Sequence, residues 1–169
     1  MRYLKTAVAC AMAGAAFAMP AAWAETIYAN GPSGAHYAQG KAEPMCTGTT
    51  SISCTDSVIG GIGNTNATLR LAVTFSATVT CTNRGGTTVA VKTQVPTTNS
   101  QTLRPSAKNG QIVVPAVESA PPNTADFEAN TTCPNPNWRK TLVDGSVGTD
   151  GFLYTLTFAG FTGPFIELP

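Results

Sequence analysis

A single run of alternating residues, 67–82, constrains the fold of this chain more than any other feature. Its apolar positions fall on every second residue and are Leu69, Leu71, Val73, Phe75, Ala77, Val79 and Cys81. The positions between them are mostly threonine, with one serine, one arginine and one alanine. A period of two places the two sets on opposite faces of an extended strand. The run therefore predicts a half-buried β-strand whose apolar face ends in a cysteine.

Shorter strand candidates, separated by turn residues, occupy much of the remaining chain. They are 26–29, 87–95, 112–118, 125–133, 138–143, 152–158 and 165–168. Pro115 cannot donate to a strand ladder, so 112–118 is predicted to be an edge strand or to break there. The polar segment 96–108 is predicted to be a loop, and no helix is expected. This series predicts an all-β protein, a single antiparallel β-sandwich that is immunoglobulin-like in architecture.

The first 24 residues have the features of a secretory signal peptide. Arg2 and Lys5 precede an alanine-rich apolar stretch at 7–17, and 22–24 is a small-x-small cleavage sequence. The stretch is shorter than the roughly 20 residues that span a bilayer, and Pro20 follows it closely. We therefore expect a signal peptide at 1–24 and one domain at 25–169. The mature chain would be periplasmic, extracellular or on the cell surface, with no stable membrane insertion.

Four cysteines remain once the leader is set aside. They are Cys46, Cys54, Cys81 and Cys133. An even number of cysteines in an exported chain indicates disulfides, and four allow three pairings. We favour Cys46–Cys54, which closes a short hairpin-like loop, and Cys81–Cys133, which ties the long strand to a distant segment. A zinc site is the competing interpretation, but the spacing lacks the paired C-x₂₋₄-C knuckles that such sites use.

Three short stretches together resemble a group of small secreted bacterial proteins. They are 61–64 (GIGN), 81–86 (CTNRGG) and 133–138 (CPNPNW), which match the pattern G-x-G-N, C-x-N-P-G-G and C-P-N-P-N-W. Arg84 stands where that pattern has proline. The resemblance covers about 61–143. It implies an exported β-sandwich in which Cys81 is bonded to Cys133, and it implies no particular activity. The order of residues differs from an immunoglobulin domain, where the tryptophan lies between the two cysteines.

Residues that carry catalysis are sparse. His36 is the only histidine and lies in a polar glycine-rich segment. The sequence has no Gly-x-Ser-x-Gly motif that would supply a serine nucleophile for a catalytic triad. Asp126 and Glu128 are two residues apart on a predicted strand, where two like charges are typical of a solvated or protected edge. The segment 144–151 offers oxygen ligands, but its Asp-Gly pairs fit a hairpin turn better than a calcium loop. We therefore expect a non-enzymatic protein with no cofactor and no metal site.

Charge and aromatic residues limit the partners. The chain has 10 basic and 9 acidic residues with no basic stripe, which disfavours nucleic acid. Tyr28, Tyr37 and Trp138 are the candidate ligand-contacting aromatics, for a glycan in particular. Trp138 has a second interpretation as a core residue packed against the disulfide at Cys133.

These observations favour an exported structural or interaction module, for example a surface or assembly subunit. Self-association or pairing with an envelope protein would use the terminal strands 26–29 and 165–168 as additions to a neighbouring sheet. A soluble carbohydrate- or ligand-binding β-sandwich is the alternative. A secreted hydrolase is the third class, and it would require His36 or a carboxylate pair to lie in a cleft.

Overall fold

The computed structural model describes residues 22–106 and 110–169. Its elements in chain order are β1 (Ala22–Trp23), β2 (Glu25–Thr26), the 3₁₀ turn η1 (Tyr28–Asn30), β3 (His36–Tyr37), β4 (Met45–Thr47), β5 (Ile52–Cys54), β6 (Ser57–Gly60), β7 (Ala67–Thr82), β8 (Thr88–Leu103), β9 (Ile112–Val114), β10 (Val117–Ser119), α1 (Thr124–Asn130), β11 (Arg139–Leu142), β12 (Gly148–Phe158) and β13 (Ile166–Leu168). All pairs of strands are antiparallel. The predicted all-β fold is confirmed.

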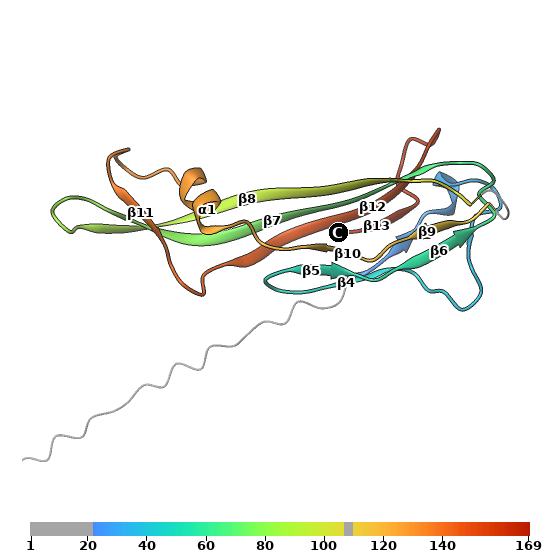
Figure 1. Cartoon of the computed structure of the whole chain (residues 1–169), viewed down its shortest axis with the longest axis horizontal. Helices are drawn as coiled ribbons and strands as arrows, with labels where there is room; N and C mark the ends of the chain where they lie inside the picture. The colour runs from blue at the N-terminus through green and yellow to red at the C-terminus, as the bar shows by residue number, and fades with distance from the viewer. Residues whose placement is uncertain (1–21, 107–109) are drawn as a thin grey trace, which may run out of the picture.

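The long strand β7 is the centre of the larger sheet. β8 pairs with it over all 16 residues on one side. On the other side β12 pairs with residues 67–76, and β11 pairs with residues 79–82. The inward-facing residues of β7 are buried at every second position, as the alternation predicts. The sheet therefore runs along most of the elongated molecule (Figure 1).

The second layer consists of two small sheets placed end to end. One contains β1, β4, β5 and β10, and the other contains β3, β6 and β9. β5 and β6 follow one another with a break of two residues, and β9 and β10 are separated in the same way by Pro115 and Ala116. Proline therefore divides 112–118 into two strands of different sheets, which confirms the predicted break.

The second layer does not extend to the far end of β7, and α1 covers that end instead (Figure 1). Phe127 is the buried residue of α1, and it joins the same core as Phe75 and Val79. Asn123 accepts a hydrogen bond from the Asp126 backbone N–H at 3.1 Å. The Asp126 carboxylate accepts one from the Asn123 backbone N–H at 3.2 Å. This capping box fixes the start of a helix too short to be stable alone.

Two predictions from the sequence were wrong about local structure. The segment 125–133 is not a strand, because the capping box directs it into α1. Asp126 and Glu128 therefore do not share a strand face. The segment 96–108 is not simply a loop, because β8 continues through Pro96 to Leu103. Its backbone groups have a partner along the whole length of β7, which outweighs the polar composition of β8.

The terminal segments are also arranged differently from the prediction. Strand β2 ends at Thr26, and η1 follows where a strand over 26–29 was expected. β13 lies between β12 and β2, with Ile166 and Leu168 fully buried. The two end strands thus complete their own sheet, and β13 has no free edge with which to extend a neighbour's sheet. Most of the predicted signal peptide, residues 1–21, lies outside the described residues.

Both expected disulfides are present. Cys46 and Cys54 are directly opposite one another on β4 and β5, with Cα atoms 4.0 Å apart. Cys81, at the far end of β7, is bonded to Cys133, with Cα atoms 5.8 Å apart. Two disulfides suit an oxidising, exported environment. Within residues 22–106 and 110–169, no helix has the length and apolar character to cross a membrane.

The two disulfides should differ in their contribution to stability. They close loops with sequence separations of 8 and 52 residues. In the chain-entropy model, replacing both cysteines of a pair by alanine costs about 2.5 kcal/mol for Cys46–Cys54 and about 4 kcal/mol for Cys81–Cys133. Guanidinium unfolding of the two double variants measures both values. Equal losses, or a larger loss for Cys46–Cys54, would show that loop entropy does not set the order.

Truncating Phe127 tests whether α1 closes the core. Phe127→Ala should lower the free energy of unfolding by about 3–5 kcal/mol, because the side chain is fully buried and leaves a cavity. Val113→Ala is the control, since Val113 is 65% exposed and the same kind of truncation there should cost under about 0.5 kcal/mol. A Phe127→Ala variant as stable as the control would mean that α1 does not seal the far end of the core.

Candidate functional site

The three aromatic residues predicted as ligand contacts do not share one site. Tyr28 lies in η1, where it is 56% exposed and its ring meets Phe165 edge to face at 5.6 Å. Tyr37 lies on β3, where its hydroxyl is 2.7 Å from the Thr26 hydroxyl. Trp138 directly precedes β11 at the opposite end of the long sheet.

The separation between the two ends follows from the register. Thr26 is opposite Ile166, Ile166 is opposite Leu156, and Leu156 is opposite Leu69. Trp138 is next to Arg139, which is opposite Thr82. Thirteen residues of β7 separate these levels, which is about 40 Å of strand. Trp138 and the two tyrosines therefore cannot contact the same small ligand.

Tyr37 is part of a local hydrogen-bonded group. The Thr26 hydroxyl donates to the Glu43 carboxylate at 2.6 Å, which links β2 to the segment before β4. Burial of the Tyr37 hydroxyl raises its pKa to about 12, so that it is neutral at physiological pH. This arrangement ties the N-terminal strands together and leaves the Tyr37 hydroxyl occupied by a protein partner.

At the other end of the molecule, two of the three recognised sequence stretches meet. The segment 81–86 contains the last two residues of β7 and most of the turn to β8, and 133–138 leads from α1 into β11. The Cys81–Cys133 disulfide joins their first residues. The third stretch, 61–64, precedes β7 at the opposite end, where Ile62 is buried. We call the region formed by 81–86 and 133–138 the tip.

Asparagine side chains shape both loops of the tip. The Asn83 carboxamide oxygen accepts from the Thr87 backbone N–H at 2.9 Å. The Asn135 carboxamide oxygen accepts from the Asn137 backbone N–H at 2.9 Å, and its backbone carbonyl accepts from the Trp138 N–H at 3.1 Å. These bonds close tight turns, a use to which asparagine is suited. Each leaves the amide N–H₂ of that asparagine unused by its turn.

The tip contains a pocket of about 380 Å³. Its lining residues are Asn83, Arg84, Asn135, Asn137 and Trp138. Trp138 is half-buried and Arg84 is exposed, so the pocket is lined by an aromatic surface and an exposed guanidinium. The volume falls within the range of small-ligand pockets. Sequence analysis singled out Trp138 but missed the other four residues as a site, although the cysteine-flanked asparagine turns were the signal.

The tip is also a concentration of positive charge. Arg84 lies in the first loop, and Arg139 and Lys140 follow the second. The segments 79–91 and 131–142 contain no acidic residue. The nearest acid along the chain, Glu128, accepts a hydrogen bond from the Leu142 backbone N–H at 3.2 Å, at the other end of β11. The field at the tip therefore favours an anionic ligand.

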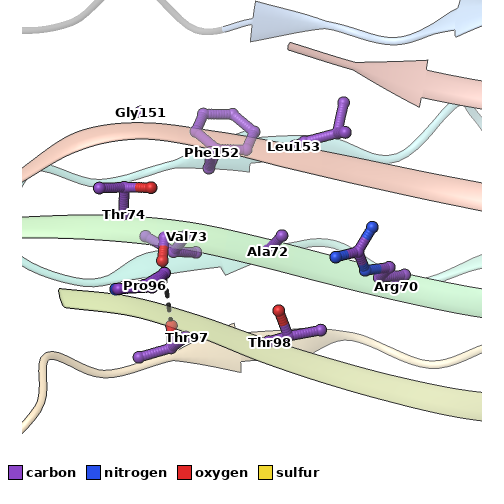
Figure 2. A pocket seen from close by; sticks show the side chains of 10 residues that line it. All are labelled: Arg70, Ala72, Val73, Thr74, Pro96, Thr97, Thr98, Gly151, Phe152 and Leu153. Atoms are coloured by element: carbon purple, nitrogen blue, oxygen red, sulfur yellow. Dashed lines mark hydrogen bonds between the residues drawn. The ribbon is translucent and has the colours of Figure 1, made fainter.

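A second hollow of about 360 Å³ lies on the outer face of the long sheet (Figure 2). The hollow forms where β7 and β12 have small residues, Ala72 and Gly151. Arg70 and Leu153 lie at its margin. Thr97 donates its hydroxyl to the Val73 carbonyl oxygen at 3.3 Å, so that group is already bonded. Arg70 is its single ionisable lining residue. The hollow thus offers fewer converging polar groups than the tip.

His36, Asp126 and Glu128, the ionisable residues considered for catalysis, line neither hollow. His36 is exposed on β3, and its ring Nδ1 is 2.8 Å from the Gly34 carbonyl oxygen. A hydrogen bond from Lys41 lowers the pKa of Asp56, with an N–O distance of 2.7 Å. Hydrogen bonds from Gln94, then Lys92, lower the pKa of Asp150. Both carboxyl groups are therefore held ionised, which does not suit a general acid.

No group of three or more histidine, cysteine, aspartate or glutamate side chains comes together as a metal site in the described part of the chain. In the segment 144–151, Gly145 has a positive φ of 71°, as a tight turn requires. Asp150 lies at an irregularity in the β7–β12 pairing and contacts Lys92 and Gln94 of β8. Its carboxylate is thus occupied by neighbouring side chains.

Comparison with protein-family models, with curated proteins and with solved structures finds no match to this chain. The assignment of a site therefore depends on the geometry above.

Tyr154 provides a test of the buried polar groups near the N-terminal strands. Its hydroxyl is fully buried and has no hydrogen-bond partner among the described residues. Tyr154→Phe should therefore leave the free energy of unfolding at pH 7 unchanged or raise it by up to about 1 kcal/mol. Chemical unfolding at pH 7 measures this, and a clear loss would show that the hydroxyl has a partner.

The same variant should alter the alkaline limit of stability. Burial raises the folded-state pKa of Tyr154 above its usual value of 10.0. The unfolded chain then loses this proton at lower pH than the folded chain, so stability is full below pH 10 and falls as pH rises above it. Tyr154→Phe should reduce that fall without abolishing it, because Tyr37 behaves in the same way.

Proposed function

We propose that this protein is an exported, non-enzymatic interaction module that uses the tip to bind a partner outside the cytoplasm. The observation that carries the proposal is the joining of two loops, about fifty residues apart in sequence, into one pocket beside a disulfide. Loops held by a rigid sheet are common places for binding sites. A bacterial envelope or its surroundings fit the predicted signal peptide and the disulfides.

The position of the tip supports the same proposal. Glu25, the first residue after the predicted leader, pairs with Glu167 of β13. β13 and the C-terminus lie beside the middle of the molecule, and the tip lies at one extreme (Figure 1). A module attached or assembled through its termini would therefore present the tip outward. The absence of a histidine or free carboxylate pair from the tip supports binding without catalysis.

Self-assembly is the second candidate function, and the outer edge of β8 favours it. β8 is 16 residues long, and among residues 22–106 and 110–169 it pairs with a strand on one side only. Such an edge can template another strand. Pro96 and Lys92, both on β8, are residues that protect edges from this kind of pairing. We therefore rank self-assembly as a less favoured function than binding of a partner at the tip.

The test uses the exported protein in two matched double variants. Arg84→Gln with Trp138→Ala alters the tip, and Arg70→Gln with Leu153→Ala alters the outer hollow by the same kinds of change. Labelled protein should bind saturably to intact cells of the bacterium that encodes it. The tip variant should bind at least about tenfold more weakly, and the outer-face variant should bind as the wild type does. A tenfold change corresponds to about 1.4 kcal/mol.

Sedimentation velocity on the same samples separates the two candidate functions. A monomer whose cell binding depends on the tip supports the proposal. Filaments or defined oligomers that are broken by a Thr98→Pro change on the β8 edge would favour assembly instead. Absence of saturable binding to cells, or equal loss in both double variants, would contradict a role for the tip.

A further inference from the structure

We infer that the tip pocket binds an acidic saccharide, with Trp138 supporting the sugar ring and Arg84 pairing with its carboxylate. This inference rests on the proposed function and specifies the ligand class of the same site. Three features of the tip carry it: the aromatic surface, the cluster of amide groups and the unbalanced positive charge.

The aromatic surface comes from Trp138. Its side chain is half-buried, so one part packs against the protein and another part lines the pocket. Trp138 is not among the residues of the hydrophobic core or the partly buried residues packed against it, so we keep its interpretation as a ligand contact. A flat apolar ring matches the C–H face of a pyranose, which buries area at little cost in side-chain entropy. The Asn135 backbone carbonyl accepts a hydrogen bond from the Trp138 N–H, which fixes the backbone from which the ring projects.

The amide groups provide hydrogen bonds of the kind that sugar hydroxyls need. Asn83, Asn135 and Asn137 line the same pocket as the tryptophan. The oxygens of Asn83 and Asn135 are engaged in the turns, and their N–H₂ groups are donors. Donors predominate over acceptors at this site, which favours a ligand rich in oxygen. Because the turn bonds already fix the asparagines, little order must be gained on binding.

The charge selects an acidic ligand from among saccharides. Without residues 1–24 the chain has 8 basic and 9 acidic residues, so it is almost neutral. The tip and the two residues that follow it nevertheless contain 3 of these basic residues, Arg84, Arg139 and Lys140, and no acidic residue. Arg84 is the one that lines the pocket. Its guanidinium can bind a carboxylate through two parallel hydrogen bonds, whereas the other two raise the local potential.

The test is a fluorescence titration of the exported protein, in which removal of the predicted leader 1–24 leaves Trp138 as the single tryptophan. The probes are short oligogalacturonides, sialylated oligosaccharides and glucuronate-containing oligosaccharides. Each is compared with its carboxyl-methylated or uncharged counterpart. We expect a saturable change in Trp138 emission with at least one acidic probe, and binding at least about tenfold weaker for its neutral counterpart. Added salt should weaken only the acidic form.

Two variants assign the roles, and one serves as the matched control. Arg84→Gln should remove the preference for the acidic form, whereas Arg104→Gln removes the same charge at an exposed position away from the tip and should leave it intact. Asn137→Ala, on an exposed side chain, should weaken acidic and neutral forms alike by severalfold while the protein stays folded by circular dichroism. The inference is overturned if no probe binds, or if Arg84→Gln and Arg104→Gln have equal effects.

A separate measurement distinguishes failure of this inference from failure of the proposed function. Cells are treated with periodate, which cleaves saccharide diols, or with protease, before the labelled protein is added. Loss of tip-dependent binding after periodate supports the inference. Binding that survives periodate but is lost after protease refutes the saccharide while the interaction module stands. No tip-dependent binding to untreated cells refutes the proposed function itself.

Discussion

The apolar face of β7 must be covered along its whole length, and the rest of the structure follows from how this is done. The strand has 16 residues, and the small sheets of the second layer do not reach its last part. There Phe127 covers the inner face, and Cys133 bonds to Cys81. A short helix and a covalent bond thus replace a missing sheet. The segment 133–138, which follows α1 and leads into β11, is the second loop of the tip. Burial of the end of β7 therefore also determines where the pocket lies.

The elements predicted well from the sequence are those whose cause is local. The alternation of β7 and the break at Pro115 depend on strand periodicity and on the missing proline N–H, which can be read directly. The helix α1 was missed for a physical reason as well. It buries only Phe127, so no helical repeat of apolar residues marks it. Its one signal was Asn123 and Asp126 at the spacing of a capping box. Two prolines before the segment and a cysteine after it made the helix harder to recognise.

The parts that could not be predicted depend on contacts between distant segments. β8 is polar on most positions because both of its faces are exposed over residues 88–90 and 98–102, and its length is imposed by its register with β7. The tip pocket unites Arg84 with Trp138, which the sequence separates by more than fifty residues. The predicted Cys81–Cys133 bond implied that the loops containing Arg84 and Trp138 lie near one another. It did not predict that the asparagine turns would direct their side chains into one pocket, because turn geometry sets that direction.

The contrast between the edges and the tip bears on how this molecule meets others. Its longest edge contains Pro96 and Lys92, and its C-terminal strand β13 is enclosed between two others. These two strands are thus less suited to adding a strand than a long apolar, uncharged edge with free N–H groups would be. The tip has the opposite character, because the disulfide and the asparagine hydrogen bonds fix its backbone and leave polar side chains exposed. A surface ordered before binding loses little entropy when a ligand arrives, so affinity can arise there from few contacts.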